Sequence, residues 1–246
     1  MIDYAVCCCQ GQRFYNEDCV GISRVQGNRA TFVLADGLGG HGMGDIASSL
    51  AVKCALTCAD DIEKSGNALL CDCFEFAQSS ILEKQKELDA RHKMKTTMVL
   101  FHLEKNKAYF GHIGDSRLYQ FSSRGCTKLT MDHSVPQLLV STGEIKEREI
   151  RNHPDRNKLL RVLGVEWENP RYFINPRPIS VKRGNGFLLC SDGFWEYILE
   201  CEMNDIFKKE NNSEKWLQKM KELVEKRGEA AEENADNFSA IVIRIV

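Results

Sequence analysis

The sequence predicts an α+β protein with packed antiparallel sheets. Short apolar runs of strand length, separated by Gly, Asn and Ser, fall into two groups along the chain. Two helical stretches lie between these groups, and further helices come before the last strand. This order favours antiparallel sheets over a wound parallel sheet, in which strands and helices would alternate regularly.

The N-terminal part combines strands with two helices. Apolar runs predict strands near residues 3–9, 18–25 and 29–35. A helix is expected over 44–60, because Ile46, Leu50 and Cys54 belong to an apolar stripe with i, i+3, i+4 spacing. A second helix is expected near 67–90, where apolar residues again recur at helical spacing.

The remainder returns to strands. Four short runs have the spacing of an antiparallel meander, at 96–103, 107–114, 116–122 and 126–131. The polar stretch 134–165 predicts short helices and loops. Later strands are expected at 171–180, 185–190 and 238–246, and later helices at 194–208 and 212–228. Since neither a repeat nor a flexible linker divides the chain, we expect one domain over residues 1–246.

The composition excludes several classes of partner. The formal net charge of the 246 residues is −2, which suggests neither nucleic acid nor an anionic membrane surface. There is no apolar run of about 18 residues and the N-terminus lacks the features of a secretory signal, so a cytoplasmic location is expected. The 11 cysteines are irregularly spaced, which favours buried structural thiols over a zinc site.

Aspartates recur at the borders of the apolar runs, namely Asp18, Asp36, Asp115, Asp192 and Asp236. One such residue is usually a turn or helix-capping residue, but several can converge at one rim of packed sheets. Crowded carboxylates need cations, and oxygen ligands select Mg²⁺ or Mn²⁺. Two such ions can activate a water for phosphate ester hydrolysis. The glycines after Asp36, in "ADGLGGHGMGD", would let backbone carbonyl oxygens approach a metal.

Two other sites compete for these residues. The stretch "GLGGHG" at 37–42 matches the dinucleotide pattern GxGxxG, but Asp36 would repel a pyrophosphate there. Cys7 and Arg13 have the spacing of a cysteine phosphatase loop, but the flanking His and Ser/Thr of that loop are missing. Both alternatives are weaker than the metal site.

Eight motifs in order resemble the metal-dependent Ser/Thr protein phosphatases of the PPM type, in their compact bacterial form. They are "GQRFYNED", "ADGLGGHGMGD", "KTTMVL", "GDSRLY", "DHS", "HPDRNKLLRVLG", "SDGFWEY" and "ADNFSAIVI". The resemblance covers nearly the whole chain. It implies a four-layer α-β-β-α sandwich, with residues 134–165 as a flap beside the cleft.

The resemblance also implies roles for the acidic residues. Asp36 would bridge two ions, Mn²⁺ or Mg²⁺, and the Gly37 carbonyl would add a ligand. Asp192 and Asp236 would hold the first ion, while Asp115 and Asp192 match the place of a third, weaker ion. Asp18 would lie close to the centre, and Glu17 would act through metal-bound water.

The other predicted residues serve the substrate or support the ligands. Arg13 would bind the substrate phosphate, because the N–H fork of a guanidinium suits phosphate oxygens. His41 is the candidate proton donor for the leaving alkoxide. Thr97 would lie close to the metal rim and orient water, and Asn237 would position Asp236.

The implied activity is hydrolysis of phosphoserine and phosphothreonine in proteins by a metal-activated water, opposing a Ser/Thr kinase. A monomer is expected. The alternative is a catalytically silent regulatory module of the same fold. The presence of Asp36, Asp192, Asp236 and Arg13 argues against that alternative.

Overall fold

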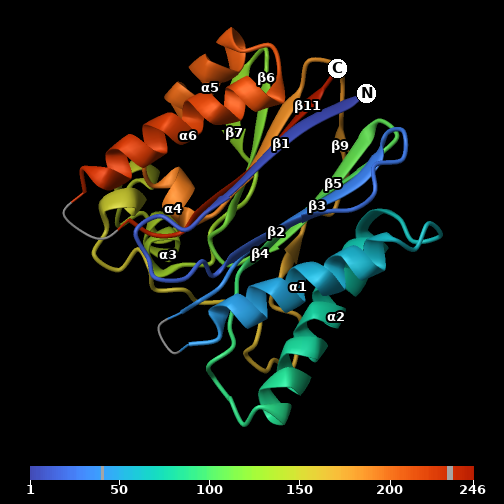
Figure 1. The fold of residues 1–246 in the computed structure, drawn as a ribbon, viewed down its shortest axis with the longest axis vertical. Helices are drawn as coiled ribbons and strands as arrows, with labels where there is room; N and C mark the ends of the chain where they lie inside the picture. Colours follow the sequence, from blue (N-terminus) through green and yellow to red (C-terminus); the bar gives the residue numbers. More distant parts are fainter. Residues whose placement is uncertain (40–41, 232–234) are drawn as a thin grey trace.

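The computed structural model describes residues 1–39, 42–231 and 235–246, and it confirms two antiparallel sheets enclosed by helices (Figure 1). The first sheet has the strand order β1-β11-β10-β6-β7. Its strands are β1 (Ile2–Cys9), β11 (Phe238–Ile245), β10 (Gly186–Cys190), β6 (Arg117–Ser122) and β7 (Gly125–Lys128). The second sheet has the order β2-β3-β4-β5-β8, and β9 also pairs with β5. Its strands are β2 (Asp18–Ile22), β3 (Arg29–Asp36), β4 (Met98–Glu104), β5 (Lys107–Ile113), β8 (Phe173–Ile174) and β9 (Ile179–Ser180).

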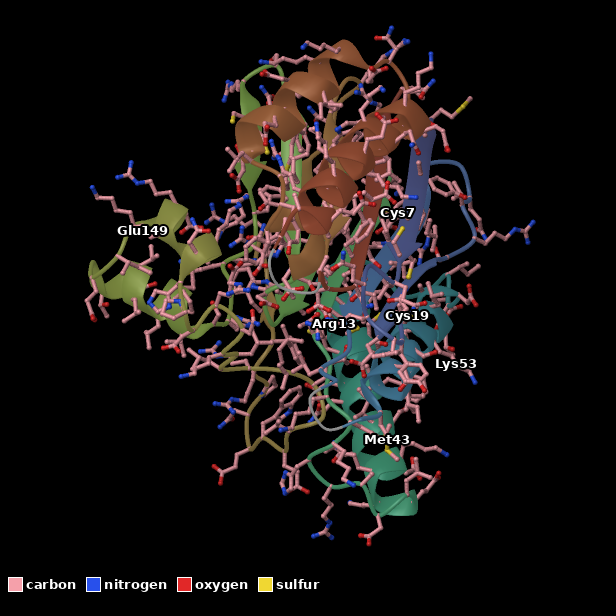
Figure 2. All side chains as sticks on the ribbon, turned by 60° about the vertical axis from the view of Figure 1, so that its left-hand side comes forward. Cys7, Arg13, Cys19, Met43, Lys53 and Glu149 are labelled. Carbon is pink, nitrogen blue, oxygen red and sulfur yellow. The ribbon has the colours of Figure 1, made fainter. Side chains whose placement is uncertain are left out.

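Helices cover the outer face of each sheet (Figure 1). The second sheet packs against α1 (Gly44–Ala59) and α2 (Gly66–Glu87). The first sheet packs against α4 (Asp192–Trp195), α5 (Glu200–Lys209) and α6 (Ser213–Glu229). The flap contains α3 (Val135–Thr142) and the 3₁₀ helix η1 (Glu147–Asn152). Figure 2 shows flap residue Glu149 standing well out from the body of the molecule.

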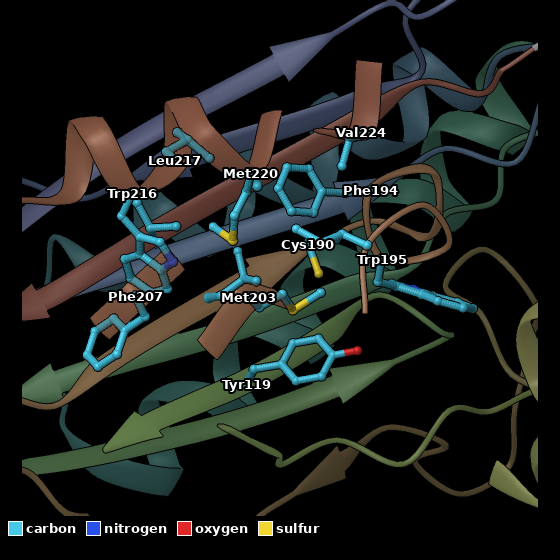
Figure 3. Close-up of a cluster of buried hydrophobic side chains, with 14 of the residues drawn as sticks. Tyr119, Cys190, Phe194, Trp195, Met203, Phe207, Trp216, Leu217, Met220 and Val224 are labelled. Atoms are coloured by element: carbon cyan, nitrogen blue, oxygen red, sulfur yellow. The ribbon is translucent and has the colours of Figure 1, made fainter. Parts of the chain in front are cut away.

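Alternation along the strands explains this layering. In β3, Val33 and Ala35 belong to the cluster under α1 and α2, while Phe32 and Leu34 belong to the core between the sheets. In β11, alternate residues likewise face α4–α6 or the inner core. Because successive strand side chains point to opposite faces, such continuous apolar strands are buried on both sides. Figure 3 shows the outer cluster beneath α5 and α6, where Phe207 and Trp216 lie close together.

Three details of the predicted elements were wrong. The four strands over 96–131 do not form one meander: β4 and β5 pair in the second sheet, whereas β6 and β7 pair in the first. The strand expected over 171–180 is the two short strands β8 and β9, since Pro176 and Pro178 between them offer no backbone N–H. The helix expected over 194–208 is two helices, α4 and α5, because Leu199 is extended and its N–H donates to Glu202.

Candidate active site

Antiparallel pairing brings the predicted aspartates to one rim. Asp18 begins β2 and Asp36 ends β3, and the two residues are directly opposite each other in the register. Likewise β10 ends just before Asp192, and its partner β11 begins just after Asp236. Asp115 follows the end of β5. Since the end of one strand lies beside the start of its antiparallel partner, residues far apart in sequence meet here.

A cleft of about 610 Å³ lies at this rim. Its lining includes the predicted residues Arg13, Glu17, Asp36, Gly37, Asp192 and Asp236. Asp18 and Asp115 are near these residues but are themselves buried, with 7% and 5% of their surface exposed. In Figure 2, Arg13 lies just beyond the end of β1, and Met43, at the start of α1, lies below it. The structure therefore collects the predicted acidic residues and the predicted phosphate-binding arginine around one opening.

The carboxyl groups clustered at the rim raise one another's pKa. Burial, followed by the charges of Asp18 and Asp192, raises the pKa of Asp36 well above its usual value. Burial raises the pKa of Asp18 to about 7, with Asp192 and Asp236 adding to the shift. Burial and Asp236 raise the pKa of Asp192 to about 6. Burial and Asp192 also raise the pKa of Asp115. These directions follow from several carboxyl groups lying close together in a place of low polarity, which favours their protonated form unless a cation is bound.

Asp236 faces the N-terminal loop. One of its oxygens is 2.8 Å from Nη2 of Arg13, whose side chain is 49% exposed, and the other accepts from the Asn237 N–H. The Asn237 side chain donates to the carbonyls of Gln10 and Tyr15 and accepts from the N–H of Glu17. Asn237 therefore fixes the whole loop that carries Arg13 and Glu17, which is more than the predicted support for Asp236.

Hydroxyl groups hold the backbone of Asp36. The Asp36 N–H donates to Oγ1 of Thr97, and the Asp36 carbonyl accepts from Oγ1 of Thr96 at 2.8 Å. The Thr97 hydroxyl also pairs with Ser116 Oγ at 2.7 Å. The Thr97 hydroxyl thus accepts a hydrogen bond from the backbone N–H of the predicted ligand Asp36. The predicted role of Thr97 in orienting water stays a prediction.

Crowding explains the first glycines after Asp36. A Cβ on Gly37 would lie 2.3 Å from the Gly44 carbonyl oxygen, and one on Gly39 would lie 1.5 Å from Oε2 of Glu17. A side chain at Gly37 would therefore collide with backbone, whereas one at Gly39 would displace the flexible end of the Glu17 side chain. His41, the predicted proton donor, lies outside the described residues.

Sequence reasoning missed two supports of the site. Ser191 Oγ donates to Oδ2 of Asp18 at 2.8 Å and accepts from the Ser239 N–H. Trp195 Nε1 donates to the Asp115 carbonyl, and the Arg117 guanidinium lies 3.4 Å from the centre of the Trp195 ring. The sequence signal was present, since Ser191, Trp195, Asp115 and Arg117 stand within "LLCSDGFW" and "GDSRLY", but the hydrogen bonds join residues that are 48 to 173 positions apart.

The competing cysteine site is not formed. Cys7 belongs to strand β1 and packs against the cluster under α6, while Arg13 lies beyond the strand end with Asp236. The thiols are also less buried than expected: Cys54, Cys73 and Cys190 are buried, whereas Cys8 and Cys201 are exposed.

The donor set fits a hard divalent cation. It consists of carboxylates and carbonyls, and Oδ1 of the buried Asp18 has no hydrogen-bond partner among the described residues. Within that part of the chain, no three His, Cys, Asp or Glu side chains already form a closed metal site. Asp236 is paired with Arg13, and Asp192 accepts a hydrogen bond from the Gly193 N–H.

Known proteins identify the family. Residues 10–237 match the protein phosphatase 2C family. The chain belongs to this family. It is similar to the serine/threonine phosphatase stp of Listeria welshimeri, with 35% identity over 213 residues that cover 82% of each chain. It is also similar to the protein phosphatase PhpP of Streptococcus pneumoniae, with 30% identity over 201 residues and 79% of each chain.

Solved structures of phosphatase 2C relatives share the fold. The serine/threonine phosphatase Stp1 of Staphylococcus aureus has a TM-score of 0.87 and 26% identity, covering 100% of this chain and 96% of that one. The catalytic domain of PstP in complex with two manganese ions has a TM-score of 0.81 and 26% identity, with 100% and 98% covered. The family is metal-dependent, in agreement with the all-oxygen donors at the rim.

Proposed function

We propose that the cleft at the acidic rim hydrolyses phosphoserine and phosphothreonine in proteins with the help of divalent cations. One observation carries this conclusion: Asp36, Asp192 and Asp236, from three distant parts of the chain, line the same cleft as Arg13. The family and the named Ser/Thr phosphatases among the relatives support the same reaction. The chain is therefore a metal-dependent protein Ser/Thr phosphatase.

Different acidic residues are assigned to different cations. Asp36 would hold two ions, and the Gly37 carbonyl, Asp192 and Asp236 would supply further ligands. Asp18 and Glu17 stand close behind them, and Asp115 with Asp192 forms the candidate for a third, weaker site. When bound, such ions lower the pKa of a water molecule and polarise the phosphate. Mn²⁺ is our first candidate, because one relative is described with two manganese ions.

Arg13 holds the phosphate in this proposal. Its half-exposed guanidinium stands at the mouth of the cleft, and its fork of N–H donors can bind two phosphate oxygens at once. The ion pair with Asp236 keeps Arg13 on the side of the cleft where the carboxylates gather. Thr97, Ser191 and Asn237 position the acidic residues, and His41 remains our candidate for protonating the leaving alkoxide.

The same proposal extends to the substrates, the oligomeric state and the location of the protein. The substrates are phosphorylated proteins, and a Ser/Thr kinase is the expected opponent. We treat residues 1–246 as one domain, since the core between the sheets draws on strands from both ends of the chain. We expect a monomer. No helix in the described ranges is both long and apolar enough to cross a bilayer. A cytoplasmic location remains a prediction.

The test is hydrolysis of a phosphothreonine peptide by the purified chain with Mn²⁺, with excess EDTA, and after Asp192→Ala. We expect turnover with Mn²⁺ that is lost under the other two conditions. A folded wild-type chain without turnover at any Mn²⁺ or Mg²⁺ concentration would refute the proposal. Arg13→Ala should raise KM more than it lowers kcat if Arg13 mainly binds the phosphate.

A further inference from the structure

Large apolar side chains gather at the base of the flap. Four of them, between 40% and 62% exposed, line one pocket: Met131, Leu138, Leu160 and Phe173. We call this the flap pocket, and its volume is about 420 Å³. Its lining comes from α3, from β8 and from the segments on either side of α3. Contiguous exposed apolar surface of this kind usually marks a binding site.

The wall of the flap pocket also contains an unused hydrogen-bond acceptor. His112 is 1% exposed, and its Nε2 is 2.7 Å from the Met131 carbonyl, so Nε2 carries the proton. Its other nitrogen, Nδ1, has no hydrogen-bond partner among the described residues. The imidazole stacks on His133 at 4.6 Å and meets Phe173 edge-on at 5.6 Å. The flap pocket thus combines apolar side chains with stacked aromatic rings, one of which has an unpaired nitrogen within the described part of the chain.

A second hollow adjoins both the flap pocket and the active-site cleft. This middle hollow, also about 420 Å³, shares Leu160 with the flap pocket. At its other end it shares Leu38 and Gly39 with the active-site cleft. The three hollows therefore follow one another in the order cleft, middle hollow and flap pocket, and a polypeptide bound in the cleft reaches the flap pocket by passing the middle hollow.

The charge of this path is positive. The middle hollow is lined by Lys95 and Arg171 together with His92, and none of its described lining residues is acidic. Arg161 continues the basic lining at the flap pocket. The acidic residue there, Asp132, is buried and engaged by Arg117. Such a surface complements an acidic segment.

We propose that the flap pocket binds an apolar side chain of the phosphoprotein substrate itself, while acidic residues of the same segment cross the middle hollow. This inference rests on the proposed phosphatase function and adds a substrate class to it. The occupant is a substrate segment because the path is continuous with the cleft and its charge opposes that of an acidic phosphopeptide. The phosphorylated residue then lies at Arg13 while a distant side chain sets the affinity.

A leucine scan tests the proposal. Phosphothreonine peptides with acidic residues on one side carry a single leucine that is moved stepwise through alanine positions. In the wild-type chain with Mn²⁺, kcat/KM should rise roughly tenfold over a narrow range of leucine positions, as for a buried apolar anchor. Leu138→Glu should abolish this gain and leave hydrolysis of p-nitrophenyl phosphate unchanged. Arg171→Glu should lower kcat/KM for the acidic peptides more than for their alanine analogues.

Ile62→Glu is the matched control, because Ile62 is 68% exposed in the loop between α1 and α2 and lies outside all three hollows. It should keep the leucine gain. A gain that is absent at every position, or that survives Leu138→Glu, would overturn the proposal while the phosphatase function stands. So would a wild-type dimer that Leu138→Glu dissociates without changing peptide kinetics. Failure of the wild type on p-nitrophenyl phosphate would instead contradict the function itself.

Discussion

Buried aspartates in this molecule are of two kinds, which are nearly equally exposed but have pKa values shifted in opposite directions. Asp132 is 4% exposed, and its carboxylate receives three hydrogen bonds from Arg117. Burial alone would raise the pKa of Asp132, but the charges of Arg117 and Lys128 outweigh it and lower that pKa. Asp18 and Asp115 are equally buried, yet their pKa values are raised. The difference lies in the source of the cation. Arg117 of the chain itself neutralises Asp132, whereas Asp18 and Asp115 require a cation from solution.

The largest effect on activity should come from neutralising one of the carboxylates at the rim. Asp36→Asn should lower kcat/KM more than about a hundredfold, since a ligand matters at least as much as its supporting residues. In EDTA the same change should raise the urea midpoint, because the raised pKa of Asp36 means that its carboxyl must take up a proton on folding, whereas Asn need not. Asp45→Asn is the control, as Asp45 lines the cleft but is exposed. Wild-type turnover after Asp36→Asn would contradict the ligand assignment.

Neutralising the paired acid should have the opposite effect on stability. Asp132→Asn removes the carboxylate that is hydrogen-bonded to the 2% exposed Arg117 and leaves it, among the described residues, only the more distant carboxylate of Glu200, at 4.0 Å, so we expect the free energy of unfolding to fall by about 3 kcal/mol. Urea unfolding measures this. Asp155→Asn, which removes a solvent-exposed pair with Lys158, should change little. Equal effects of the two changes would mean that the buried pair with Arg117 does not stabilise the fold.

The two sets should also respond oppositely to pH. For Asp18 and Asp192 the folded pKa, about 7 and about 6, lies above the unfolded value. The folded state therefore binds more protons than the unfolded state between roughly pH 4 and pH 7, and stability in EDTA should fall as pH rises through this window. The contribution of Asp132, whose pKa is lowered, is lost below about pH 4 instead.

Urea midpoints in EDTA at pH 5 and pH 7.5 test this expectation. Saturating Mn²⁺ should remove most of the decline, because bound cations take over the role that protons have at low pH. A midpoint in EDTA that rises steadily across the window would show that the rim carboxylates are not held together as the structure has them.

The smallest effect concerns the hydroxyl behind the rim. Ser191→Ala removes the donor to Asp18 and the acceptor of the Ser239 N–H, so turnover should fall about tenfold. The effect should be larger at low Mn²⁺ than at saturation if Ser191 acts by orienting the acid. Ser79→Ala is the control, since Ser79 bonds only within its exposed helix turn. A loss that does not depend on Mn²⁺ would indicate a purely structural role.

Much of the fold was predictable because its signals are local. Apolar runs and helical stripes in the sequence locate most strands and helices to within a few residues, including β3, α1 and β11. Errors arose where local signals were weak or long-range pairing decided. Two prolines divided the 171–180 strand, and nothing local indicates that the chain changes sheets between β5 and β6. The acidic candidates were predictable because each stands at the border of its own apolar run.

The sequence by itself determined which carboxylates stand at strand ends and which motifs surround them. Tertiary structure alone decided that Asp132 contacts Arg117, while Asp18 and Asp36 lie opposite each other on the adjacent strands β2 and β3. It also decided that Asn237 holds the Arg13 loop and that four apolar residues form the flap pocket. The physical reason is that charge pairing and burial depend on contacts across the fold, and residue order along the chain does not specify which distant groups will share one low-polarity space.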